Sequence, residues 1–146
     1  MVKIYEAEED TIQKIIDNLK KIANGKNKYL TKDNLAVENL YDIDYDSDYE
    51  DEMMKRNSEI EKILSSNKYY AVIYNNQYVE FITSDYADDA INSLAIKDGI
   101  NIFKTPYGYI VRAYYNGKTS DLIFVVLNQN EYNLMKYWRS EWYEFW

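Results

Sequence analysis

A run of alternating acidic and aromatic residues has the most distinctive chemistry in this sequence. It reads YDIDYDSDYEDE and covers residues 41–52. It holds seven of the 25 acidic residues and none of the 17 basic ones, so it accounts for nearly all of the net charge of −8. In an extended chain, every second residue lies on the same side, about 6.6 Å apart. The segment would then present a row of acids on one side and mainly aromatic residues on the other.

This spacing is of the order of that between phosphates along one nucleic-acid strand. A row of negative charge attracts a basic protein surface, whereas direct nucleic-acid binding requires clustered Lys and Arg. We therefore expect the partner to be a basic nucleic-acid-binding protein, and neither nucleic acid nor a membrane. The predicted partner contacts are Asp42, Asp44, Tyr45, Asp46, Asp48, Tyr49, Glu50, Asp51 and Glu52. The alternative is a flexible acidic loop without mimicry, because Asp is a poor strand former and like charges repel.

The same carboxylates do not form a recognisable calcium loop. Asp42, Asp44 and Asp46 match the first three ligand positions of an EF-hand, but Ser47 and Met53 replace the required Gly and Glu. The sequence therefore predicts no dedicated metal site.

Catalytic chemistry has few candidates. The chain has no His and no Cys, which excludes Ser-His and Cys-His nucleophilic sites and zinc–cysteine sites. Its four Gly form no phosphate-binding loop. Glu80 lies among apolar residues of a predicted strand, and Asp88 and Asp89 are neighbours on a predicted helix. For both, a solvent-facing position is the favoured interpretation, so we predict no enzyme, no catalytic residue and no cofactor.

The C-terminal 15 residues, YNLMKYWRSEWYEFW, contain seven aromatic residues. Helical spacing predicts one buried stripe consisting of Leu134, Met135, Trp138, Trp142 and Phe145. Tyr137, Tyr143 and Trp146 lie off that stripe, where they would either pack or form a contact surface.

The elements that position these residues follow from periodicity and turn signals. Residues 2–6 alternate as a short strand would, and Ile12, Ile15, Ile16, Leu19 and Ile22 predict a helix that Gly25 caps. Further helices are expected at 31–39, 51–65, 85–97 and from 129 to the C-terminus. Strands are expected at 69–74, 78–83, 100–104, 109–115 and 122–127, the last one central.

Short turns between neighbouring strands indicate an antiparallel sheet. We predict an α+β fold: a single domain of residues 1–146, with about five to six antiparallel strands, helices packed on them, and long N-terminal and C-terminal helices. The N-terminus, MVKIYEAEED, lacks the pattern of a signal peptide, and the apolar runs are too short to span a membrane. We therefore expect a cytoplasmic protein, in a host cytoplasm if it is viral.

In its composition and in YDIDYDSDYEDE, the chain resembles phage-encoded anti-CRISPR and anti-restriction inhibitors of the acidic nucleic-acid-mimic kind. The resemblance implies a protein that blocks the substrate groove of a nucleic-acid-handling host enzyme without catalysis. An immunity protein or antitoxin that plugs a basic toxin site is a close alternative. A carboxylate-based enzyme or small-ligand protein, and a scaffold that assembles through the aromatic C-terminus, are alternatives of other classes.

Overall fold

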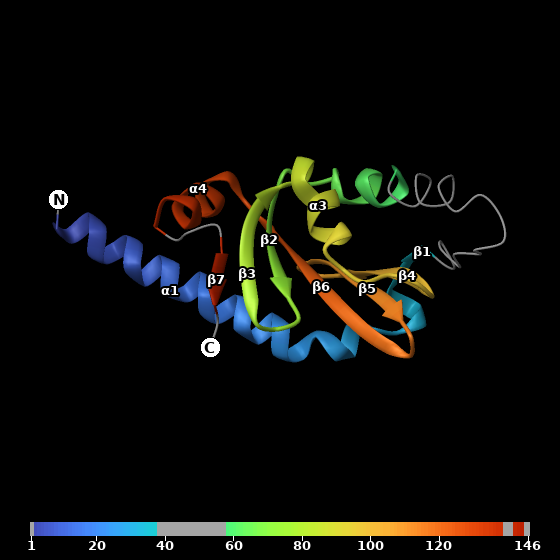
Figure 1. Cartoon of the computed structure of the whole chain (residues 1–146). Helices are drawn as coiled ribbons and strands as arrows, with labels where there is room; N and C mark the ends of the chain where they lie inside the picture. Colours follow the sequence, from blue (N-terminus) through green and yellow to red (C-terminus); the bar gives the residue numbers. More distant parts are fainter. Residues whose placement is uncertain (1, 38–57, 139–141, 145–146) are drawn as a thin grey trace.

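A computed structural model describes residues 2–37, 58–138 and 142–144 of the chain (Figure 1). Seven strands in these ranges form one antiparallel sheet with the order β1-β4-β5-β6-β2-β3-β7. The strands are β1 (Leu35–Val37), β2 (Tyr69–Tyr74), β3 (Tyr78–Thr83), β4 (Gly99–Thr105), β5 (Gly108–Tyr115), β6 (Lys118–Leu127) and β7 (Trp142–Glu144). The fold is thus α+β with an antiparallel sheet, as predicted.

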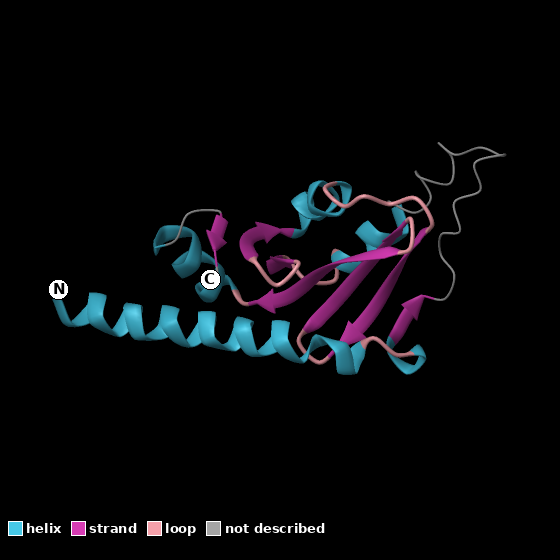
Figure 2. Cartoon of the chain, turned by 60° about the horizontal axis from the view of Figure 1, so that its bottom comes forward, coloured by secondary structure: helices cyan, strands magenta, loops and turns pink. Residues whose placement is uncertain are grey.

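Helices cover both faces of the sheet (Figure 2). On one face, the long helix α1 (Val2–Gly25) packs with α4 (Gln129–Trp138) through a core that includes Ile16, Leu19 and Met135. On the other face, a helix at 58–64 contributes Ile60 and Leu64 to a second core. The short helix α3 (Ala87–Asn92) completes that second core.

The central strand β6 belongs to both cores. It pairs with β5 on one side and β2 on the other, which confirms its predicted central position. Ile123 and Val125 face the α1 side, while Leu122 and Phe124 face the α3 side. A strand covered on both faces needs an almost continuous apolar sequence, and this explains LIFVVL at 122–127.

The predicted turns also form. Asn75 and Asn76 adopt positive φ angles of 47° and 62° between β2 and β3, and Asn116 and Gly117 adopt 49° and 78° between β5 and β6. Asn and Gly tolerate this left-handed conformation better than other residues. At the start of α4, the Asn128 side chain accepts the Glu131 N–H and the Glu131 carboxylate accepts the Asn128 N–H, a reciprocal cap.

Two predictions near the N-terminus are wrong. Residues 2–6 begin α1 and do not form a strand. The helix expected at 31–39 is replaced by a 3₁₀ turn, Lys32–Asn34, and by β1. In β1, Leu35 pairs with Phe103 and Val37 with Ile102. The free edge of β4 supplies backbone partners from a distant part of the sequence, and local periodicity cannot reveal them.

Two further helices end earlier than predicted. The helix expected at 85–97 consists of a 3₁₀ turn, Ser84–Tyr86, and α3, while Gly99 begins β4. The C-terminal helix ends at Trp138, and Trp142 lies in β7, paired with Glu80. The two tryptophans therefore do not share one helix, and the predicted helical stripe is wrong at Trp142. Phe145 and Trp146 lie outside the described residues, as does the predicted helix over 51–57.

Gly108 is a glycine whose replacement should disturb the sheet. Its φ is +152°, and a Cβ there would overlap the backbone carbonyl of Phe124 on β6. We expect Gly108→Ala to lower the free energy of unfolding by about 2–3 kcal/mol, because the strain adds to a clash with backbone atoms. Urea unfolding measures this loss. Gly25→Ala is the control: a Cβ there meets nothing within 4 Å, so an equal loss in that variant would contradict the steric explanation.

Candidate functional site

The predicted contact segment, residues 41–52, lies outside the described residues, together with all nine of its predicted contacts. The described chain on both sides of it is fixed in the fold. Before it, Val37 pairs with Ile102 at the sheet edge. After it, Ile60 and Leu64 are fully buried in the core on the α3 face.

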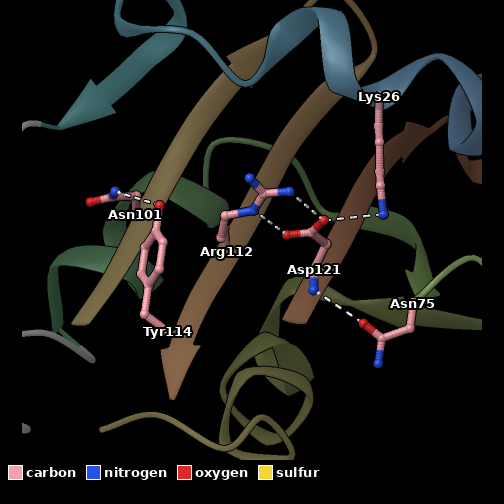
Figure 3. Close-up of polar contacts among 6 residues, drawn as sticks. All are labelled: Lys26, Asn75, Asn101, Arg112, Tyr114 and Asp121. Carbon is pink, nitrogen blue, oxygen red and sulfur yellow. Dashed lines mark hydrogen bonds and ion pairs between the residues drawn. The ribbon is translucent and has the colours of Figure 1, made fainter. Parts of the chain in front are cut away.

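Within the described residues, the strongest polar cluster surrounds Asp121 on β6 (Figure 3). We call Lys26, Arg112 and Asp121 the Asp121 cluster. Arg112 donates two hydrogen bonds to the carboxylate, from Nε to Oδ1 at 2.7 Å and from Nη2 to Oδ2 at 2.9 Å. Lys26 Nζ lies 3.1 Å from Oδ2. The Asp121 side chain is only 8% exposed, so the two cations replace the water that it loses on folding.

Neighbouring polar residues extend the Asp121 cluster into a row across the sheet. The Asp121 N–H donates to the Asn75 side-chain oxygen at 3.1 Å, which ties the turn after β2 to β6. Asn101, opposite Arg112 in the sheet, donates to the Tyr114 hydroxyl at 3.1 Å. The row crosses β4, β5 and β6 near the C-terminal end of α1, and Lys26 connects it to the segment that follows this helix (Figure 3).

The charge state of the Asp121 cluster argues for a structural role. Burial alone would raise the pKa of Asp121, but hydrogen bonds from Arg112 and Lys26, together with their positive charges, hold it below its ordinary value. A carboxylate with a lowered pKa is a weak proton acceptor at neutral pH, whereas a general base works best with a pKa near the working pH. The cluster fastens the end of α1 to the sheet.

A second candidate is a cavity of about 480 Å³ beside the end of β3, which we call the edge cavity. Its walls come from β2, β3, α3 and α4, and Figure 1 shows the two helices at the same end of the sheet. Its charged lining residues are Glu80, Asp89 and Lys136. Its aromatic lining residues are Tyr74, Phe81, Tyr86 and Tyr132.

A tyrosine–carboxylate pair lies in the edge cavity. The Tyr74 hydroxyl donates to Glu80 Oε2 at 2.7 Å. Burial raises the pKa of Tyr74, as do the hydrogen bond to Glu80 and the negative charges of Glu80 and Asp89. Tyr74 is therefore a neutral donor at physiological pH and not a phenolate base or nucleophile. The Tyr74 hydroxyl can hold the Glu80 carboxylate in place for binding a ligand, but the pair contains no activated nucleophile.

The structure corrects the interpretation of Glu80. A solvent-facing position was favoured, but the residue is half-buried and bonded to Tyr74 in the edge cavity. Asp89 is exposed, as expected for a solvated helix face, yet it lines the same cavity. The alternating pattern of YYAVIY and YVEFIT places Tyr74 and Glu80 on one face of the hairpin, and this signal could have paired them. The predicted turn at Asn116-Gly117 could likewise have paired Arg112 with Asp121, but no local signal connects Lys26 to them.

In the described ranges, no three Asp, Glu, His or Cys side chains lie close enough together to hold a metal ion. None of the helices in the described part of the chain has both the length and the apolar character needed to cross a bilayer.

Comparison of the chain with protein-family models, with curated proteins and with solved structures finds no match.

Proposed function

We propose that this protein is a non-catalytic inhibitor that binds a basic nucleic-acid-handling enzyme and blocks its substrate groove. The observation that carries the proposal is the segment at 41–52, with seven acids, no base and strict alternation up to Glu50. A groove that binds phosphates presents clustered Lys and Arg, and such a groove attracts a row of carboxylates over long range.

The placement of the segment in the chain supports this function. Twenty residues, 38–57, connect β1 to the helix at 58–64, and both of these flanking elements belong to the folded sheet structure. An acidic segment held at both ends loses less freedom on binding than a free tail would.

The described residues also support binding over catalysis. The tightest ion-pair cluster holds Asp121 ionised between two cations, and the edge cavity contains a neutral Tyr74 beside a carboxylate. Neither arrangement supplies an activated nucleophile with a paired base. Both supply fixed charge, which a binding protein can use.

The test replaces Asp42, Asp44, Asp46 and Asp48 by Asn, which removes four charges and keeps side-chain size. Purified restriction endonucleases and CRISPR effector complexes are assayed for DNA cleavage with increasing protein. We expect the wild type to inhibit at least one of them and to compete with its nucleic acid. The variant should need at least about tenfold more protein, since screened charge pairs contribute up to about 1 kcal/mol each. Inhibition by the wild type should also weaken above 0.1 M salt, where the Debye length falls below about 10 Å.

The matched control removes four exposed charges elsewhere, through Glu9→Gln, Asp10→Asn, Asp17→Asn and Asp33→Asn. It should inhibit as well as the wild type. Equal inhibition by the segment variant, at low and at high salt, would contradict the proposal. Inhibition of none of these enzymes, but of a toxin nuclease, would instead support an immunity protein.

A further inference from the structure

We propose that the edge cavity binds an arginine side chain of the basic partner protein. The inference rests on the proposed function for the nature of the partner. It is argued without the residues at 41–52, because every lining residue that it uses lies in the described ranges.

The position of the cavity suits a protruding side chain. The cavity lies where Phe81, Ile82 and Thr83 end β3, between α3 and α4. In the part of the chain that the structure describes, β7 pairs with β3 only at Tyr78–Glu80. Its volume of about 480 Å³ falls in the range of about 300–1,000 Å³ that is usual for ligand sites.

The charge in the cavity favours a cation. Among the described lining residues, Glu80 and Asp89 contribute two carboxylates and Lys136 contributes one ammonium group, so their net charge is negative. Among the described residues, the ion pairs involve Lys26, Arg112 and Asp121, and include neither Glu80 nor Asp89. A half-buried carboxylate has lost part of its hydration, and a neutral phenol compensates that loss less than a cation does. A partner cation would complete the pair.

The Glu80 carboxylate can accept hydrogen bonds from that cation. Oε2 accepts the Tyr74 hydroxyl at 2.7 Å. An ionised carboxylate has two acceptor oxygens, so Glu80 can accept further hydrogen bonds from a cation. Burial first, and then the hydrogen bond to Glu80 and the nearby carboxylates, raise the pKa of Tyr74 and keep the phenol protonated as a donor.

Aromatic residues on the cavity wall favour guanidinium over ammonium. Tyr86 is 60% exposed although it lines the cavity, so its ring is available at the entrance. A guanidinium group is planar, stacks on aromatic rings and donates several hydrogen bonds in one plane. An arginine can therefore stack on Tyr86 while it bonds to Glu80 and Asp89, whereas a lysine ammonium group would make mainly point-charge contacts.

The test uses the full chain and Nα-acetyl-L-arginine methylamide as the probe, with the citrulline analogue as its uncharged equivalent. Binding is measured by NMR titration of the tyrosine signals. We expect the arginine probe to shift the Tyr74 and Tyr86 signals in a saturable way, and the citrulline analogue to shift them little. Glu80→Gln with Asp89→Asn should weaken binding about tenfold or more, because charge-assisted hydrogen bonds are lost.

Glu9→Gln with Asp10→Asn is the matched control and should bind like the wild type, since both residues are exposed on α1. If the Glu80/Asp89 variant unfolds, binding of the arginine probe to Tyr86→Ala tests the inference instead. This exposed ring can be removed without opening the core. Equal binding of the citrulline analogue, equal weakening in the control, or unchanged binding in Tyr86→Ala would each overturn the inference.

The two proposals fail in different ways. Loss of the arginine site with nuclease inhibition unchanged would overturn the cavity inference alone. Saturable arginine binding in a chain that inhibits no nuclease would overturn the proposed function alone. The variant with four Asn replacements at 42–48 should keep its affinity for the arginine probe, and a loss there would contradict the independence of the cavity from that segment.

Discussion

Replacement of Phe124 by Ala is expected to lower the free energy of unfolding by about 3–5 kcal/mol, the usual cost of truncating a buried aromatic side chain. Phe124 is fully buried on the central strand β6. Its ring packs edge to face against the Tyr70 ring, with 5.6 Å between the two ring centroids. Tyr70 in turn donates to the Leu64 carbonyl at 2.6 Å, which fixes the helix at 58–64. Removal of the Phe124 ring would therefore loosen both the sheet and the helix that follows the acidic segment.

Urea and thermal unfolding measure this effect, and the melting temperature should fall by about 10 °C or more. Val126→Ala is the control on the same strand, because its side chain is 37% exposed. It should cost less than about 1 kcal/mol. Similar losses in the two variants would show that burial in the α3-face core does not determine the effect.

Replacement of Asp121 by Ala is expected to lower the free energy of unfolding by about 3 kcal/mol at pH 7. Loss of one partner from a buried ion pair costs about 3–5 kcal/mol, and the 23% exposure of Arg112 places the effect at the lower end. The variant would leave Lys26 and Arg112 close together without their carboxylate. A double-mutant cycle with Arg112→Met should show a coupling of about 1 kcal/mol or more, while Asp33→Asn, at an exposed position, should be neutral.

The effect of Asp121→Ala should depend on pH. The folded protein holds the pKa of Asp121 below its ordinary value, despite the opposing effect of burial, because Arg112 and Lys26 bind the ionised form. The stabilisation is therefore complete above the unfolded pKa of about 3.9, and it is lost as the pH falls through the folded pKa. The stability difference between wild type and variant should be constant from pH 7 to 5 and smaller at pH 3. A difference that does not change over this range would show that the ionised carboxylate is not the cause.

The sequence by itself determined the elements that depend on neighbouring residues. Asn75-Asn76 and Asn116-Gly117 form turns because these residues adopt positive φ at low cost. The isoleucines of α1 recur every three or four residues, so one buried face follows directly from helical geometry. The apolar run at 122–127 can only be stable between two covered faces, which placed it at the centre of the sheet.

The tertiary structure alone decided the edges of the sheet and which distant residues complete the two polar sites. β1 and β7 are three-residue strands whose hydrogen-bond partners, on β4 and β3, are more than 60 residues away in sequence. A short segment takes its conformation from the backbone groups available to it, and its own pattern is too brief to specify one. Arg112 and Asp121 lie opposite each other in the β5–β6 hairpin, but Lys26 joins them from a distant part of the sequence. Tyr132 of α4 likewise joins Glu80 and Tyr86 at the edge cavity from a distant part of the sequence. A local pattern records which face a residue occupies, but the charges that meet across that face depend on strand order and register, and these are fixed only when the whole sheet forms.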